Sequence, residues 1–151
     1  MSEKGPTPPS CRLFVIMARE APVGLILRRG PTRWVQLIRW ETVSDHFLDG
    51  AWFKGRIYED RCDLSPDGSL FLYMCHGGWP RPGYTDSWTA ISRAPWGYAL
   101  ALWPWGTTYG GGGRFITNRE VMLHIGAGYP IQAHPDHPDR GMYYGPRQGK
   151  P

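Results

Sequence analysis

The segment from Arg61 to Cys75, RCDLSPDGSLFLYMC, restricts the possible folds most strongly because it contains the clearest hairpin signal in the chain. Its SPDG tetrapeptide predicts a tight turn, since proline presets one turn dihedral and glycine accepts a positive φ. The strand register that follows pairs Leu64 with Phe71. Runs rich in β-branched and aromatic residues lie before and after this hairpin, so it is predicted to be the middle of a longer antiparallel series.

The runs with strand composition fall into two groups of four and a shorter third group. The first group contains Arg12 to Ala18, Val23 to Arg29, Trp34 to Thr42 and Ala51 to Tyr58, with a loop expected at Ser44 to Gly50. The second contains the two hairpin strands, Ser87 to Arg93 and Tyr98 to Trp103. Phe115 to Ile116 and Val121 to Ile125 complete the series, and no segment has the period of an amphipathic helix.

The expected fold class is therefore all-β, with antiparallel four-stranded units arranged as an incomplete propeller or as a sandwich. Residues 1–10 are polar and rich in proline, which predicts a flexible tail. Residues 11–125 are expected to form the β domain. Residues 126–151 are rich in Pro, Gly and polar side chains and are expected to be irregular.

Composition narrows the function classes only slightly. The 151 residues carry a formal net charge of +4, which permits contact with nucleic acid without predicting it. Eight Trp, eight Tyr and five Phe exceed what an ordinary core needs, so some rings are expected to face a partner or ligand. No signal-peptide pattern and no apolar run of membrane-spanning length occurs, so a cytoplasmic protein that does not enter membranes is expected.

The hairpin resembles a segment of a known family. The sequence Leu64 to Tyr73, LSPDGSLFLY, is similar to the first two strands of a blade in WD-repeat and related β-propellers, and Leu37 to Thr42 resembles the third strand of a preceding blade. The chain lacks the Gly-His and Trp-Asp dipeptides of that family. At about 40–45 residues per blade it is also too short to close a propeller alone. The resemblance therefore implies an incomplete propeller that assembles with copies of itself or with a partner.

The stretches RRGP, WFKGRIYE and CDLSPDG also resemble segments of bacterial proteins that have no assigned activity, so this second resemblance implies a bacterial source and nothing about chemistry.

The sequence contains few residue patterns that indicate catalysis or metal binding. Cys75 and His76 are adjacent, but neighbours on a strand point to opposite faces, so they do not form a nucleophile and its base. Cys62 and Cys75 lie on facing arms of the hairpin, which leaves a disulfide open although their register is off by about two residues. The motif His134 to Asp139, HPDHPD, offers borderline metal ligands, but its prolines keep it extended. We predict no enzyme activity, no cofactor and no metal site, with metal binding at this motif left open.

Two sets of side chains are candidates for binding. Aromatic residues gather in the two long Gly/Pro-rich loops, where rings often build binding surfaces, and the candidates are Trp79, Trp96, Trp103, Trp105, Tyr109 and Arg114. The glycine run Gly110 to Gly113, in the second of these loops, lacks the ending of a phosphate loop and is expected to be a flexible loop. A possible basic face comprises Arg28, Arg29, Arg33, Arg39, Lys54 and Arg56.

These candidates lead to one favoured function and two alternatives. The favoured function is a non-catalytic binding or assembly module that docks a protein partner, possibly its own copy, through exposed strand edges and the aromatic loops. The first alternative is nucleic-acid contact through the basic face. The second is an aromatic-lined site for a carbohydrate or another small ligand, for which Trp103 and Trp105 would be essential.

Overall fold

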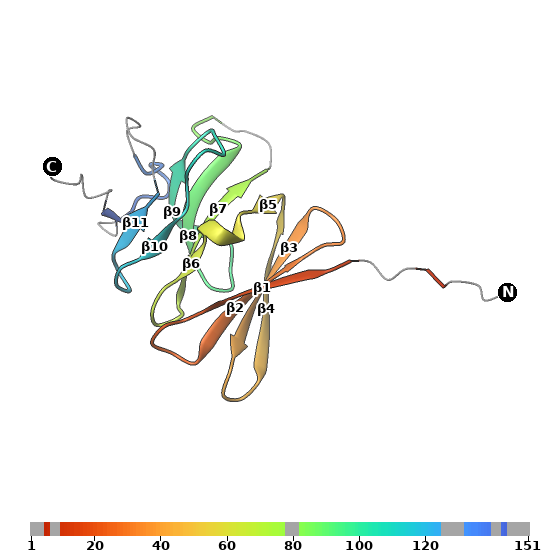
Figure 1. Cartoon of the computed structure of the whole chain (residues 1–151). Coiled ribbons are helices and arrows are strands. Elements are labelled where there is room, and N and C mark those ends of the chain that lie inside the picture. Colours follow the sequence, from red (N-terminus) through yellow and green to blue (C-terminus); the bar gives the residue numbers. More distant parts are fainter. Residues whose placement is uncertain (1–4, 7–9, 78–81, 125–131, 140–142, 145–151) are drawn as a thin grey trace.

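Three β-sheets form the protein in a computed structural model that describes residues 5–6, 10–77, 82–124, 132–139 and 143–144 (Figure 1). The first sheet consists of β1 (Arg12–Met17), β2 (Val23–Arg29), β3 (Trp34–Glu41) and β4 (His46–Lys54), in that order. The second has the order β5 (Arg56–Ile57), β7 (Leu70–His76), β8 (Ser87–Arg93) and β9 (Ala99–Pro104), with β6 (Asp63–Leu64) also paired to β7. The third contains β10 (Gly113–Phe115), β11 (Val121–Leu123) and β12 (Tyr143–Tyr144).

The strands confirm the expected fold class. All pairings in the first two sheets are antiparallel, and among the described residues the parallel pairing is that of β11 with β12. The helical residues within the described ranges are confined to a 3₁₀ turn at Glu59–Arg61. No helix in the described part of the chain is long and apolar enough to cross a membrane.

The predicted hairpin forms between β6 and β7, with the predicted pairing of Leu64 with Phe71. Gly68 takes a φ of 78° in the turn, and Leu70 N donates to the Ser65 hydroxyl at 2.9 Å. The Asp67 carboxylate accepts hydrogen bonds from the hydroxyls of Ser65 and Ser69, both at 2.7 Å. Turn chemistry and flanking apolar residues thus agree at this site, which is why the register is readable from sequence.

The strand expected at Ala51 to Tyr58 is wrong in its bounds, because two strands share these residues. β4 already begins at His46, where the residue expected to lie in a loop pairs with Glu41, and a bulge between Gln36 and Ile38 shifts its register. At Gly55 the chain leaves the first sheet, and Arg56 pairs with His76 of the second sheet. Gly55 has a φ of 140°, and a Cβ there would lie 2.6 Å from the His76 carbonyl oxygen, so glycine permits this crossing.

The second sheet lies between the other two and has an apolar core on each face. Leu27 and Leu37 of the first sheet pack with Phe71 and Tyr73 of β7. On the other face, Trp103 belongs to a second buried cluster with residues of β10 and β11. Alternation along β7 explains this division, because successive side chains point to opposite faces. The second sheet is therefore fully covered, whereas the first sheet has one covered face.

The described part of the C-terminal segment lies along β9. His134 N donates to the Leu102 carbonyl at 2.7 Å, and Leu102 N donates to the His137 carbonyl at 3.1 Å. Residues 132–139 contain no helix or strand, and their backbone satisfies Leu102 of β9 at its outer edge. The formation of β12 was not expected from the sequence. One of the strand edges predicted to dock a partner is thus occupied by the chain itself.

Candidate functional site

The face of the first sheet that points away from the second sheet is apolar, and we call it the outer face. Strand alternation directs Leu25, Leu27 and Leu37 into the core and their neighbours outward. The cross-strand pairs Val15 with Ile26, Ile26 with Ile38, and Trp40 with Phe47 lie on this outer side. The apolar members of the outer face are Leu13, Val15, Met17, Ile26, Trp34, Ile38, Trp40, Phe47 and Trp52.

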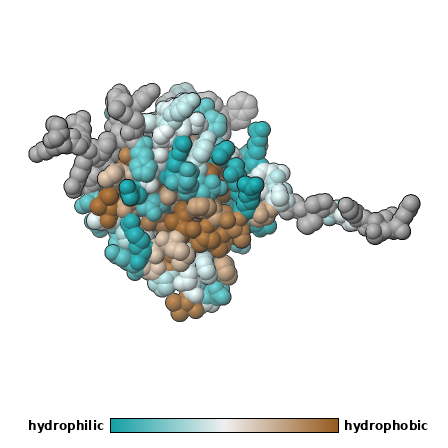
Figure 2. Space-filling view, in the orientation of Figure 1, coloured by the Kyte–Doolittle hydropathy of each residue, from teal (hydrophilic) through white to brown (hydrophobic). Residues whose placement is uncertain are grey.

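Several of these side chains are exposed. Leu13 is 65% exposed, Phe47 54%, Met17 46%, Val15 42% and Trp34 41%. Hydrophobic side chains gather in the middle of Figure 2, over β1, as expected for such a surface. These five residues alone expose on the order of 500 Å² when large side chains are taken at roughly 150–250 Å² each. An apolar surface of this size matches the largest patch of a typical monomer, and such patches are often functional.

An absent side chain at Gly24 makes part of the outer face flat. A Cβ at this position would lie 2.9 Å from the Met17 sulfur and 3.4 Å from the Trp40 ring, so both side chains lie over the glycine. The Trp40 ring stacks on Phe47 with centroids 6.1 Å apart and planes 7° from parallel. Trp40 Nε1 also donates to the Asp45 carboxylate at 2.8 Å. These contacts fix the rings in one orientation, which lowers the entropy cost of covering them.

Charged residues border the outer face with opposite signs at its two ends. At the end where β3 begins, Lys54 pairs with Trp34 and places Nζ 6.0 Å from its ring centroid, and Arg28 pairs with Gln36. Toward the end where β3 finishes, Asp49 pairs with Ile38, and Asp45 bonds the Trp40 ring. The face is therefore positive at one end and negative at the other.

The basic residues predicted from sequence lie mainly at the positive end of the first sheet. Arg29 makes an ion pair with Glu59 at 3.6 Å, and the Arg56 guanidinium lies 4.7 Å from the Tyr58 ring centroid. Together with Arg12 they line a hollow of about 470 Å³. The sequence reasoning missed Arg12, although its pairing with Arg29 follows from the register of the first hairpin. Arg33, in the β2–β3 turn, is exposed at the same end, whereas Arg39 lies elsewhere, on the inner side of β3.

The predicted aromatic cluster does not form as one site. Trp96 precedes β9, while Trp105 and Tyr109 follow it, and a six-residue strand separates them by roughly 20 Å. Trp105 Nε1 donates to the Tyr109 carbonyl at 2.8 Å, so these two do lie together. Trp103 is 2% exposed and belongs to the core, because alternation along β9 turns it toward the third sheet. Arg114 is exposed on β10.

Trp79 lies outside the described residues. The Trp103 ring is enclosed between the second and third sheets, so its position gives no support to a small-ligand site that depends on it.

The glycine run is packed rather than loose, which corrects the expected flexible loop. Gly111, Gly112 and Gly113 are buried. Gly112 N donates to the Thr89 hydroxyl at 2.9 Å, and Gly111 N donates to the His124 carbonyl at 2.7 Å. The run passes close to Arg61 and Met74, where a side chain would not fit. Glycines are needed here for close approach of the backbone to the second sheet.

The histidines and cysteines have structural positions. His134 stacks on Tyr84 with ring centroids 4.0 Å apart, and His137 Nδ1 lies 2.7 Å from the Ala99 carbonyl. No group of three metal-ligating side chains occurs among the described residues. The three cysteines are free. Burial raises the pKa of Cys62 to about 12 and that of Cys75 well above its usual value, so both thiols are protonated and unreactive at neutral pH.

Comparisons with protein-family models, with curated proteins and with solved structures find no match to this chain. Function is therefore inferred from the surfaces described above, and the outer face of the first sheet is the apolar one among them.

Proposed function

We propose that this protein is a non-catalytic assembly module that binds a second copy of itself through the outer face of the first sheet. The observation that carries the proposal is the exposed apolar face whose border changes from positive to negative along the strands. An incomplete stack of sheets leaves one such face uncovered, and a matching face from another copy would cover it. This narrows the docking function expected from sequence to one surface and one partner.

The charge pattern favours a second copy over an unrelated partner. A twofold axis lying in the outer face, perpendicular to the strands, places two copies face to face with opposite strand directions. Lys54 and Arg28 of one copy then approach Asp49 and Asp45 of the other, and the same contacts repeat on the other side of the axis. Opposite charges thereby meet at both borders, which favours this orientation over the parallel one.

The size of the face also suits a pair. One side of a standard protein interface buries about 800 Å², and its centre is more apolar than its rim. The exposed apolar surface of roughly 500 Å² estimated above supplies the centre of such an interface. The charged side chains at both ends supply a polar rim. Sheets that pack face to face align their strands within about 30°. The side chains of the two outer faces would therefore interdigitate along the strands.

Exchanging charges across the proposed interface tests the orientation. Lys54→Asp and Asp49→Lys are each expected to weaken self-association about 10-fold, because each single change creates two repulsive contacts in a symmetric pair. The double variant restores opposite signs and is expected to return to within about threefold of the wild type. Sedimentation equilibrium of the four proteins measures the dissociation constants.

Arg114→Asp is the matched control, since it reverses an exposed charge on β10, away from the outer face. It is expected to leave the dissociation constant unchanged. If the double variant is as weak as the product of the two single variants, the antiparallel orientation is wrong.

Nucleic-acid binding is a second candidate, favoured by one observation: Arg12, Arg29 and Arg56 line the same hollow at the positive end of the first sheet. Tyr58, beside Arg56, supplies a ring on which a base could stack. A labelled single-stranded oligonucleotide is expected to bind more weakly as salt rises. Arg12→Gln with Arg56→Gln is expected to reduce the slope of log affinity against log salt concentration by about 1.4, since each phosphate contact contributes roughly 0.7 for a single strand. Fluorescence anisotropy measures both. An affinity that the double substitution leaves unchanged would exclude this surface.

A further inference from the structure

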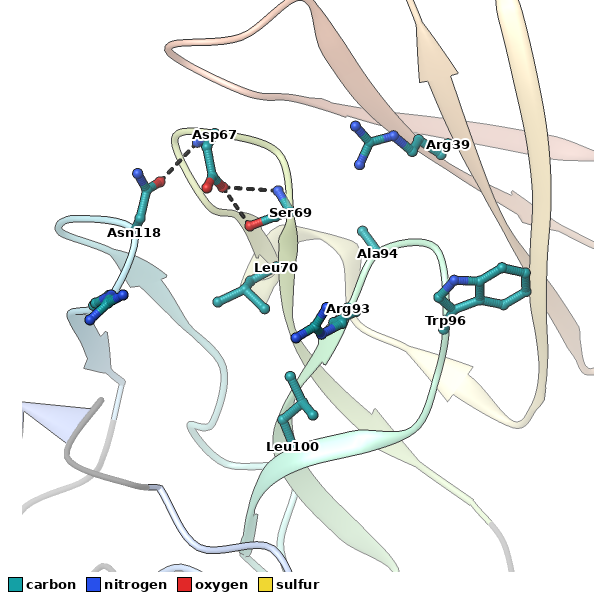
Figure 3. A pocket seen from close by; sticks show the side chains of 10 residues that line it. Arg39, Asp67, Ser69, Leu70, Arg93, Ala94, Trp96, Leu100 and Asn118 are labelled. Atoms are coloured by element: carbon teal, nitrogen blue, oxygen red, sulfur yellow. Dashed lines mark hydrogen bonds between the residues drawn. The ribbon is translucent and has the colours of Figure 1, made fainter.

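A cleft of about 920 Å³ opens beside the SPDG turn, on the side of the first sheet opposite the outer face. Figure 3 shows Arg39 and Trp96 at one side of it, Asn118 and the turn at the other, and Arg93 between them. Leu70 contributes an apolar wall. The volume lies within the range of small-molecule sites, and the lining is more polar than is usual for them.

Positive charge dominates the cleft. Arg39, Arg93 and Arg119 line it together with a single carboxylate, that of Asp67. Arg39 Nε donates to the Glu41 carboxylate at 3.0 Å, and Arg39 Nη1 donates to the Gly68 carbonyl at 3.3 Å. The guanidinium groups of Arg93 and Arg119 make no hydrogen bond or ion pair with any residue that the structure describes. Two guanidinium groups therefore stand at the cleft with their donors unused.

The carboxylate in the cleft does not pair with these guanidinium groups. Asp67 Oδ1 accepts from the Ser65 hydroxyl, the Ser69 hydroxyl and the Ser69 backbone N–H. Partial burial acts to raise the pKa of Asp67, but these hydrogen bonds outweigh it and lower the pKa below its usual value. The carboxylate is thus ionised and committed to the turn, which leaves the arginines for a ligand.

Two further groups define what the ligand would look like. Asn118 Oδ1 accepts from Asp67 N at 2.9 Å, so its amide nitrogen is the end left to donate. Trp96 is 49% exposed, and its backbone N donates to the Arg93 carbonyl at 2.6 Å, so ring and guanidinium arise from the same tight turn. An exposed indole offers a flat surface for stacking on a planar ring.

We propose that this cleft binds a small phosphorylated molecule that carries a planar ring. Arg93 and Arg119 attract the phosphate from different sides of the cleft, and a guanidinium group binds phosphate oxygens through paired hydrogen bonds. Trp96 stacks on the ring, and Asn118 donates a hydrogen bond from the opposite wall. The site uses the inner side of the first sheet and the second sheet, so it is separate from the outer face and does not depend on self-association.

Calorimetric titration of the full chain with three probes tests the proposal. ADP carries phosphate and ring, inorganic pyrophosphate carries phosphate alone, and adenosine carries the ring alone. ADP is expected to bind saturably with one site per chain, pyrophosphate at least about threefold more weakly, and adenosine undetectably up to about 5 mM. Combined Arg93→Gln and Arg119→Gln substitutions are expected to weaken ADP and pyrophosphate at least 10-fold.

Two variants make the test specific. Trp96→Ala is expected to remove the advantage of ADP over pyrophosphate and to leave pyrophosphate binding unchanged. Arg114→Gln removes an exposed arginine outside the cleft and is expected to change neither affinity. The proposal is overturned if neither phosphate probe binds saturably up to about 5 mM, or if the two arginine substitutions leave the affinity unchanged. None of these substitutions changes a residue of the outer face. Sedimentation of the same samples therefore tests the self-association proposal independently.

Discussion

Val15→Glu is expected to leave the chain folded and to weaken its self-association at least 100-fold. Val15 lies on β1 between Leu13 and Met17 and pairs with Ile26, so its side chain projects from the apolar part of the outer face. It is 42% exposed in the single chain, and a glutamate there can reach water without disturbing the core. In the paired state the carboxylate would be buried without a partner, twice per dimer because of the symmetry. Sedimentation velocity across a range of concentrations measures the loss.

Ile116→Glu is the control for this substitution. Ile116 is 47% exposed, lies directly after β10, and belongs to no part of the outer face. It therefore undergoes the same change from a branched apolar side chain to a carboxylate, with no expected effect on association. Circular dichroism and thermal unfolding of both variants verify the fold. If Val15→Glu associates as strongly as the wild type, the outer face is not the interface.

Gly112→Ala is expected to destabilise the fold by about 3 kcal/mol or more, whereas Gly106→Ala is expected to cost about 1 kcal/mol. The two glycines share almost the same backbone angle, with φ of 73° and 74°. A Cβ at Gly112 would run into the Arg61 carbonyl, while the nearest atom to a Cβ at Gly106 is the Thr85 methyl at 3.6 Å. The pair therefore separates the cost of the positive φ from the cost of the collision.

Urea unfolding of the two alanine variants at one protein concentration measures this difference. Equal concentrations matter because self-association stabilises the folded chain by mass action. Equal destabilisation of the two variants would mean that the glycine run relaxes away from the second sheet, as a loose loop would. A larger loss at Gly112 supports the packed arrangement, in which Gly112 N also bonds the Thr89 hydroxyl.

Much of the strand order could be predicted because local signals and packing agree. The pairing of Leu64 with Phe71 follows from the SPDG turn, and Val23–Arg29 and Ser87–Arg93 have the bounds that their composition predicts. The predicted bounds were wrong in the β4–β5 region because one apolar run contributes strands to two sheets. The change of sheet at Gly55 depends on the His76 carbonyl beside it, a contact between distant residues that no local pattern contains.

The candidate site was harder to read from sequence. The excess of aromatic residues predicted that some rings face a partner or ligand. Trp103 is instead part of the core, and the exposed rings of the outer face lie on strands rather than on loops. Runs such as RLFVIM look like strands covered on both faces, so exposure of Leu13 and Val15 could not be inferred from them. The opposite charges at the two ends emerge only when the register brings Lys54 to Trp34 and Asp49 to Ile38.

The cleft could not be predicted from the sequence either. Arg39, Arg93 and Arg119 belong to the first sheet, the second sheet and the connection before β11, and each looks like an ordinary surface arginine in its own segment. Asn118 lies in the polar connection between β10 and β11. Its hydrogen bond to the Asp67 backbone places it at the cleft, and such a contact across 51 residues has no sequence signature.

The mass of the unmodified chain in solution tests the central proposal most directly. Sedimentation equilibrium is carried out in reducing buffer, because Cys11 is exposed and would otherwise permit disulfide-linked pairs. We predict that the mass rises with concentration from the chain value of 17.1 kDa to twice that value and no further, since a face-to-face pair is closed by its twofold symmetry. A mass that stays at 17.1 kDa up to roughly 100 µM would contradict self-assembly through the outer face.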